Sequence, residues 1–245
     1  MDIHKPKPWH GWREFLKEYL IIVVGVLTAL GAEQGVEWLH WRHLAERAEA
    51  DLAAGLGPDL VNAYTFVVIE SCGRARVTEL AAALQKPGPD WRASPMPSSV
   101  AMRESYGVPQ AYYFIGRLWS HAAWDTALSS GVLNHMPHDR VARYADLYRI
   151  VDSTSTIQRA TNTMVTHLAP LAYDRKLSDA EKDHYLELVS EVAAASNNFA
   201  AASRSMLKGA HELGVDPPAE EVAAVLKRQH DGRGACVTDV KLPLS

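Results

Sequence analysis

Two groups of residues carry side-chain types that could bind a metal ion. The first recurs every three residues, so a helix would place it on one face; it consists of Glu37, His40 and His43. The second lies where a helix is predicted to begin and consists of His135, His138 and Asp139. A transition-metal site needs three or four converging ligands, and neither group has an evident further ligand. We therefore predict no metal site and no cofactor.

No catalytic motif stands out in the chain. The sequence lacks the G-x-S-x-G, H-E-x-x-H, G-x-G-x-x-G and P-loop patterns, and Cys72 has no histidine near it in sequence. Ser129 and Ser130 fall at the predicted end of a helix, where hydroxyls usually act as capping groups. The sequence identifies no catalytic residue; a triad can also be assembled from distant positions without any such motif.

Aromatic residues are concentrated in one short segment. Trp119 and Trp124 follow Tyr112, Tyr113 and Phe114 within a few residues. Packing into a hydrophobic core explains such a cluster best, and a ligand pocket or partner surface at the two tryptophans is the alternative. Trp119 and Trp124 are therefore our candidates for a pocket or a partner surface.

The two cysteines, Cys72 and Cys236, lack the paired spacing of zinc or redox sites. In an oxidising compartment they could form one disulfide between an early helix and the C-terminal tail. Two unpaired cysteines are the alternative, and the sequence favours neither.

The overall charge disfavours nucleic acid as a partner. The formal net charge is -4, and lysines and arginines are scattered along the chain instead of forming a basic patch. With 47% hydrophobic and 22% charged residues, the chain has a globular composition and can bury a sizeable core.

Tyr19 to Ala32 is a charge-free apolar run that predicts a membrane helix. This run is shorter than the roughly 20 residues that a span needs, so we extend it to Trp38. Phe15 and Tyr19 then lie at one interface and Trp38 and Trp41 at the other, as in aromatic belts. A cleaved signal peptide and a buried core helix are the competing interpretations; the helical pattern that continues beyond the run favours an uncleaved anchor.

The flanking charges predict an orientation. Lys5, Lys7, Arg13 and Lys17 precede the charge-free run, whereas the first charged residues after the run are Glu33 and Glu37, before Arg42. By the positive-inside rule, residues 1–18 are cytoplasmic, residues 19–38 cross the inner membrane, and the domain beyond them is exported to the periplasm of a Gram-negative cell.

One face of the predicted span carries small residues. Gly25, Ala29 and Ala32 recur at spacings that let a second helix approach closely in lipid. Glu33 adds a carboxyl near the apolar region, where it would need a partner or exposure at the headgroups. We therefore treat Gly25, Ala29, Ala32 and Glu33 as a candidate packing face.

The rest of the chain predicts an all-α fold in which the membrane helix continues into an antiparallel bundle over residues 39–229, followed by a tail over 230–245. Gly55-Leu56-Gly57-Pro58 is expected to end or bend the first helix, giving one antiparallel pair that stops near Pro87. Residues 87–99 should form a surface loop, and helix should return before Trp119. No strand pattern is evident.

Three further helices have clear sequence signals. One starts near Pro137 and ends at Pro170, and a second starts at the capping box Ser178-Asp179-Ala180-Glu181 and ends before Gly214. A short third helix follows Pro217-Pro218. Gly131 is placed as the C-terminal cap of the helix that contains Trp124.

Two blocks resemble an uncharacterised family of bacterial single-pass membrane proteins. The first, Trp12 to Leu30, reads W-R-E-F-L-K-E-Y-L-I-I-V-V-G-V-L-T-A-L and contains G-V-L-x-A-L; the second, Ala123 to Leu133, contains W-x-x-x-x-x-S-G-x-L and is followed by Tyr144 and Tyr148. The resemblance covers about a quarter of the chain. It implies a signal anchor with an exported helical domain and says nothing about chemistry.

These features lead to a ranked set of functional hypotheses. The first is a membrane-anchored interaction protein, an accessory or assembly subunit that binds the bilayer and other membrane or envelope proteins, or itself. The second is a helical-bundle domain that senses a ligand and signals through a partner. The third, an envelope hydrolase, lacks identifiable residues.

Overall fold

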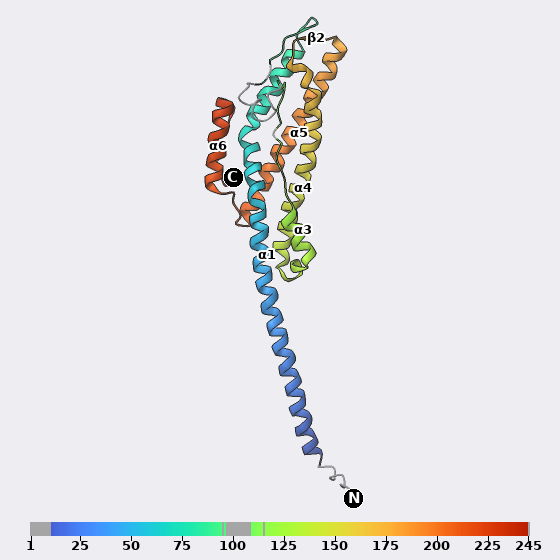
Figure 1. Cartoon of the computed structure of the whole chain (residues 1–245), viewed down its shortest axis with the longest axis vertical. Coiled ribbons are helices and arrows are strands. Elements are labelled where there is room, and N and C mark those ends of the chain that lie inside the picture. Colours follow the sequence, from blue (N-terminus) through green and yellow to red (C-terminus); the bar gives the residue numbers. More distant parts are fainter. Residues whose placement is uncertain (1–10, 95, 97–108, 115, 245) are drawn as a thin grey trace.

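One helix, α1 (Trp12–Leu84), runs through the whole length of the molecule and organises the fold (Figure 1). In this computed structural model, which describes residues 11–94, 96, 109–114 and 116–244, the first part of α1 projects alone. Its second part packs against the remaining helices. The predicted all-α fold, with a long N-terminal helix that continues into an antiparallel bundle, is confirmed.

The other helices all lie around the second part of α1. They are α3 (Ala122–Ser130), α4 (His138–His167), α5 (Asp179–Glu212) and α6 (Ala219–Arg233). Short 3-10 turns, η1 (Val132–His135), η2 (Ala169–Ala172) and η3 (Gly234–Cys236), join or follow them. Helix α5 runs in the opposite direction to α1 and α4 and packs against both, whereas α6 packs on another side of α1 (Figure 1).

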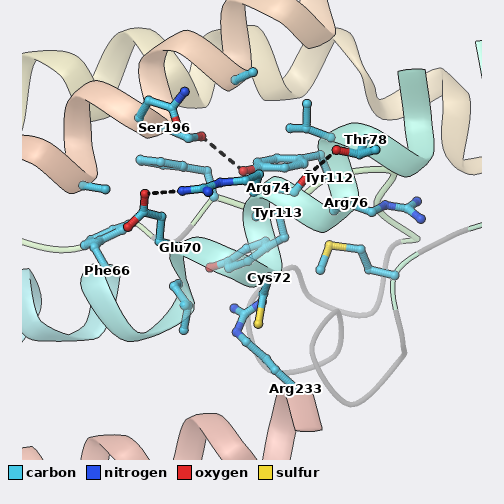
Figure 2. A pocket seen from close by; sticks show the side chains of 18 of the residues that line it. Phe66, Glu70, Cys72, Arg74, Arg76, Thr78, Tyr112, Tyr113, Ser196 and Arg233 are labelled. Carbon is cyan, nitrogen blue, oxygen red and sulfur yellow. Dashed lines mark hydrogen bonds and ion pairs between the residues drawn. The ribbon is translucent and has the colours of Figure 1, made fainter. Parts of the chain in front are cut away.

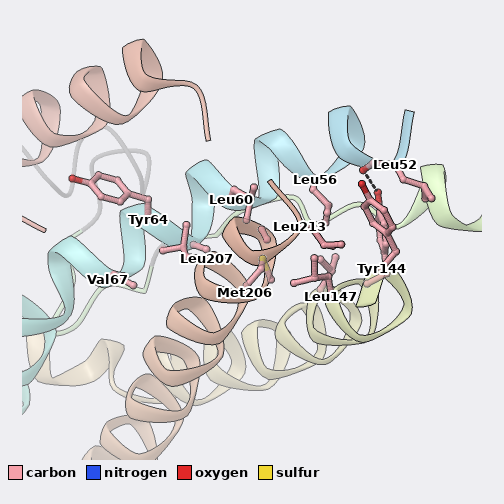
Figure 3. Close-up of a cluster of buried hydrophobic side chains, with 14 of the residues drawn as sticks. Leu52, Leu56, Leu60, Tyr64, Val67, Tyr144, Leu147, Met206, Leu207 and Leu213 are labelled. Carbon is pink, nitrogen blue, oxygen red and sulfur yellow. Dashed lines mark hydrogen bonds between the residues drawn. The ribbon is translucent and has the colours of Figure 1, made fainter. Parts of the chain in front are cut away.

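Two hydrophobic clusters fill the bundle. The cluster nearer the projecting helix is built on leucines of α1 and includes Leu52, Leu56, Leu60, Tyr144, Leu147 and Met206 (Figure 3). The second cluster lies toward the far end of the bundle and centres on Phe66, Phe114 and Phe199, whose rings contact one another. The domain core is therefore distributed along α1.

The prediction that Gly55-Leu56-Gly57-Pro58 ends or bends the first helix is wrong, because α1 continues through Pro58 to Leu84. A proline inside a helix costs about 3 kcal/mol through its missing N–H and a clash with the preceding turn. Leu52, Leu56 and Leu60 are fully buried on either side of it. Since burying one leucine contributes about 1.5–3 kcal/mol, packing of this stretch outweighs the proline.

Gly55 lies within α1, where it permits close packing of neighbouring helices and does not form a turn. A Cβ atom at this position would lie 2.7 Å from Cβ of Ala123 and 2.9 Å from the Tyr148 hydroxyl oxygen. That hydroxyl donates a hydrogen bond to the carbonyl oxygen of Leu52 at 2.8 Å. Gly55 thus lets α3 and α4 approach the backbone of α1.

Among the described residues 109–114 and 116–121 the helix expected before Trp119 is absent, and α3 begins only at Ala122. Side chains of α4 and α1 satisfy the backbone of this segment instead. The Gln158 amide accepts from the Arg117 N–H at 3.0 Å and donates to the Arg117 carbonyl at 2.7 Å. The Asn62 amide donates to the carbonyl of Leu118 at 3.0 Å. These partners are far away in sequence, so local periodicity could not reveal them.

The far end of the bundle is closed by two short segments. Strands β1 (Asp90–Trp91) and β2 (Arg175–Lys176) pair antiparallel, with Asp90 opposite Lys176. The predicted loop 87–99 therefore contributes a strand, which at two residues is too short to show alternation. The Lys182 ammonium donates to the carbonyls of Lys86 at 2.7 Å and of Gly88, and so holds the turn that follows α1 against α5.

Several predicted helix ends are confirmed. The Ser178 side chain accepts from the Glu181 N–H and the Glu181 carboxylate accepts from the Ser178 N–H, which completes the capping box of α5. Gly131 follows α3 with φ at 74°, a left-handed conformation that suits glycine. Helix α6 extends to Arg233, a few residues beyond the predicted boundary at residue 229.

Candidate functional site

The projecting part of α1 is apolar and unburied. It contains an 18-residue stretch with a mean hydropathy of 1.8 of which no part is buried in the molecule, so it is long and apolar enough to cross a membrane. Large apolar side chains are exposed all around it: Trp12, Phe15, Leu16, Tyr19, Leu20, Ile21, Ile22, Val24, Val26, Leu27, Leu30, Val36, Trp38 and Leu39. The described part of the chain covers none of this apolar surface.

The predicted packing face lies within this segment. Gly25, Ala29, Ala32 and Glu33 are all exposed, and a Cβ built on Gly25 would meet no described atom within 4 Å apart from its chain neighbours and the nearby backbone of its own helix. The described part of the chain therefore leaves this face open to lipid or to another helix.

The structure places Trp119 and Trp124 in the bundle. The Trp119 indole N–H donates to Oε1 of Gln158 at 3.0 Å, and its ring lies 5.7 Å from that of Phe199. Trp124 stacks on Tyr148 with ring centroids 5.8 Å apart. Neither tryptophan lines the two cavities described below.

Cys72 and Cys236 form a disulfide that joins α1 to η3, with Cα atoms 4.9 Å apart. The tail around it is bound to α1 as well. The Thr238 N–H donates to the carbonyl of Val68 at 2.9 Å, and the Tyr64 hydroxyl donates to that of Val240 at 2.9 Å. The disulfide thus fixes a tail that already packs on the helix.

The histidine groups have other contacts. His135 stacks on Trp41 with ring centroids 3.9 Å apart, which fastens η1 to α1. Nδ1 of His43 lies 3.7 Å from Oε2 of Glu46. In the part of the chain that the structure describes, no three His, Cys, Asp or Glu side chains are grouped so as to hold a metal ion.

A partly enclosed cavity of about 520 Å³ lies beside the disulfide, and this is the candidate ligand site (Figure 2). Its walls come from α1, from α5, from the segment around Tyr112 and from the end of α6. The apolar wall includes Phe66, Val77 and Phe114, and the charged lining side chains are Glu70, Arg74, Arg76, Arg204 and Arg233. The lining therefore contains four guanidinium groups and one carboxylate.

Glu70 joins two of these arginines. Nη2 of Arg74 donates to Glu70 Oε1 at 2.7 Å, and Arg204 on α5 donates to both Glu70 oxygens. The hydrogen bond from Arg204 is the main cause that lowers the pKa of Glu70, against the opposing effect of its partial burial. The carboxylate therefore stays ionised near neutral pH.

A second cavity, of about 570 Å³, lies nearer the projecting helix. It is formed between α1 and α3 and is mostly apolar, with Trp41, Leu44, Ala48, Ala123, Ala127 and Val132 among its lining residues. It begins three residues beyond Trp38, where the predicted span ends.

Sequence reasoning did not find the cavity beside the disulfide. Glu70 and Arg204 are 134 residues apart, and neither belongs to a motif. One signal was available: Tyr112, Tyr113 and Phe114 all line the cavity and belong to the aromatic segment noted in the sequence. The two tryptophans chosen from that segment are the members that point elsewhere.

Comparison of the chain with known protein families, with curated proteins and with solved structures finds no match. The resemblance to a family of single-pass membrane proteins therefore stays a prediction, and the functional argument rests on the chain itself.

Proposed function

We propose that this chain is a single-pass membrane protein with an exported helical domain, and that it binds another membrane or envelope protein as an accessory or assembly subunit. One observation carries the proposal: α1 is a single helix whose first part is apolar and unburied and whose second part is the backbone of a folded bundle. Because the span continues without a break into the domain, a protein bound to the span is mechanically coupled to the domain, and a molecule bound to the domain is coupled to the span.

Two independent features support export of the domain. Four lysines and arginines precede the charge-free run Tyr19 to Ala32, whereas the first charged residues after the run are Glu33 and Glu37, which favours a cytoplasmic N-terminus. The disulfide between Cys72 and Cys236 belongs to the domain, and disulfides persist in oxidising compartments such as the periplasm. Both features favour the same side of the membrane, which in a Gram-negative cell is the periplasmic face of the inner membrane.

The small-residue face supports contact with a second helix in the membrane. Gly25 and Ala29 are open, and small residues at this spacing permit the close backbone approach that drives helix association in lipid. The apolar cavity between α1 and α3 offers a further contact surface directly beyond the span.

The test is purification of the tagged full chain from membranes in lipid nanodiscs. Wild type should recover a partner protein in a fixed ratio. The variant Gly25→Leu/Ala29→Leu should lose it, because the added side chains prevent close approach. Leu27→Phe adds bulk on the other side of the helix, about 200° from Gly25, and should retain the partner. Recovery of the chain alone from wild-type membranes would contradict the proposal.

The ligand-sensing hypothesis is the second candidate, and the cavity lined by Glu70 and the arginines favours it. A sensor of this kind would signal through a membrane partner, so the two hypotheses are compatible.

A further inference from the structure

The cavity beside the disulfide combines an apolar wall with an excess of positive charge. Phe66, Val77 and Phe114 supply apolar surface, and four arginines stand against the one lining carboxylate, Glu70. A volume of about 520 Å³ lies within the range of small-molecule sites. A ligand suited to these walls has a bulky apolar part and a negative charge.

Not all of the arginines are equally available. The Arg76 guanidinium donates from Nε to the carbonyl of Ala111 at 2.7 Å and also to that of Ser94, and its Nη1 lies 2.7 Å from Glu79 Oε2. These contacts hold the segments that form the wall. Arg76 is therefore a structural group.

Arg74 and Arg204 are the groups suited to bind an anion. They approach the same carboxylate from different helices, and Glu70 neutralises one of their two charges. The carboxylate thus holds two like-charged groups side by side and leaves a single excess positive charge. Each guanidinium has five N–H donors, so a second carboxylate can bind while Glu70 remains in place.

The aromatic side chains next to these two arginines form the part of the cavity that fits the apolar body. The Phe66 and Phe114 rings have centroids 5.4 Å apart, and the Tyr112 hydroxyl is hydrogen-bonded to Ser196 Oγ at 3.2 Å. Figure 2 shows this hydroxyl pair on the same side of the cavity as Glu70 and Arg74, whereas Arg233 enters from the opposite side. Flat aromatic surface next to paired guanidinium groups favours a ligand with a ring adjacent to its anionic group.

We propose that this cavity binds an organic monocarboxylate with an aromatic or similarly bulky apolar body, whose carboxylate contacts Arg74 and Arg204. The single excess charge at these arginines favours a monoanion over a phosphate dianion. The planar carboxylate of Glu70 already shows that the arrangement accepts this geometry. The cavity residues of α1 belong to the same helix as the predicted span, so a bound ligand contacts the membrane helix directly.

The test measures binding of two probes of equal size to the full chain in zwitterionic nanodiscs by isothermal titration calorimetry. The probes are 2-naphthoate and the neutral 2-naphthamide, and empty nanodiscs supply the background. Wild type should bind the naphthoate at least about tenfold more tightly, because charge-assisted hydrogen bonds are stronger than neutral ones. Equal affinities of wild type for naphthoate and naphthamide would overturn the proposal. So would the absence of naphthoate binding at about 1 mM, a concentration at which even a weak site binds its ligand.

Variants locate the site. Arg74→Gln/Arg204→Gln should weaken naphthoate binding by about tenfold or more and leave naphthamide within about twofold, since only the charge is removed. Ala193→Phe should weaken both probes, because Ala193 lines the cavity and a ring would occupy it. Arg149→Gln removes an arginine that is 73% exposed and paired with Asp146 away from the cavity, and should change neither affinity.

Naphthoate affinity that survives in the double variant, or falls equally in Arg149→Gln, would contradict the assignment. An unchanged thermal unfolding midpoint shows that the variants are folded. The naphthoate test and the partner-recovery test are independent. Naphthoate can bind when no partner is recovered, and a partner can be recovered when naphthoate does not bind.

Discussion

The two parts of α1 contain similar side chains in opposite surroundings. Leu20, Leu27 and Leu30 in the first part are half or more exposed, whereas Leu52, Leu56 and Leu60 in the second part are fully inaccessible to solvent. The first part has apolar residues on all sides, as a lipid-facing helix does, and the second buries a stripe against other helices. One continuous helix thus carries two apolar surfaces, and the described part of the chain covers only the second of them.

The largest expected effect is a loss of stability in the bundle that leaves the span unchanged. Cys72→Ser/Cys236→Ser should lower the free energy of unfolding of the bundle by about 5 kcal/mol, because the disulfide closes a loop with a sequence separation of 164 residues. Insertion of the span should be unaffected. Urea unfolding in nanodiscs measures the first quantity and membrane fractionation the second. A loss below about 1 kcal/mol would show that the disulfide constrains little beyond the tail contacts.

A matched pair of leucine truncations compares the two parts directly. Leu60→Ala should cost about 2–5 kcal/mol, because it leaves a cavity in the core. Leu27→Ala, at a side chain 63% exposed, should leave the urea unfolding midpoint of the bundle unchanged. If Leu27→Ala destabilised the bundle as much as Leu60→Ala, the division of α1 into two environments would fail.

A buried carboxyl in the second part gives a pH-dependent test. Burial raises the pKa of Asp59 from 3.8 to about 7, opposed by the hydrogen bond from the Ser120 N–H and by His121. Because its folded-state pKa lies above the unfolded value, its contribution to stability is present below about pH 4 and is lost as the pH rises through about 7.

Asp59→Asn should therefore stabilise the bundle at pH 8, by up to about 4 kcal/mol, and change little at pH 4. Asparagine keeps an oxygen that can accept from Ser120. Urea unfolding at the two pH values measures the difference. A destabilised variant at pH 8 would show that the ionised carboxylate is the favoured form.

The smallest expected effect concerns the capping box of α5. Ser178→Ala should cost about 1 kcal/mol, because it removes the acceptor for the Glu181 N–H. Ser190→Ala is the control: this hydroxyl bonds the carbonyl of Leu186 one turn before it in the same helix and caps nothing. Equal thermal midpoints for the two variants would argue against a capping role.

The sequence predicted the elements whose signals are local. The starts of α4, α5 and α6 follow from Pro137, the Ser178 capping box and Pro217-Pro218. Gly131 follows α3 in the expected left-handed conformation. Each of these signals involves residues within one helical turn of each other, so it can be recognised in the sequence without knowledge of the tertiary structure.

What the sequence did not reveal depends on partners far along the chain. Proline at position 58 is a local helix breaker that distant packing of Leu56 and Leu60 overrides. The segment before α3 is not helical, and Gln158 on α4 satisfies its backbone at Arg117. The candidate ligand site requires Glu70 and Arg204 to meet across the bundle, and neither residue carries a sign of this in its neighbourhood.

In the proposed topology, α1 crosses the membrane once and presents the bundle on the exported side. The most direct test of this topology is labelling with a membrane-impermeant maleimide in intact spheroplasts, with one cysteine added at Lys17 or at the exposed Arg149. The native cysteines are bonded to each other and should not react. The account predicts labelling of Arg149→Cys in intact cells and of Lys17→Cys only after lysis. Labelling of Lys17→Cys in intact cells, with Arg149→Cys protected until lysis, would contradict it.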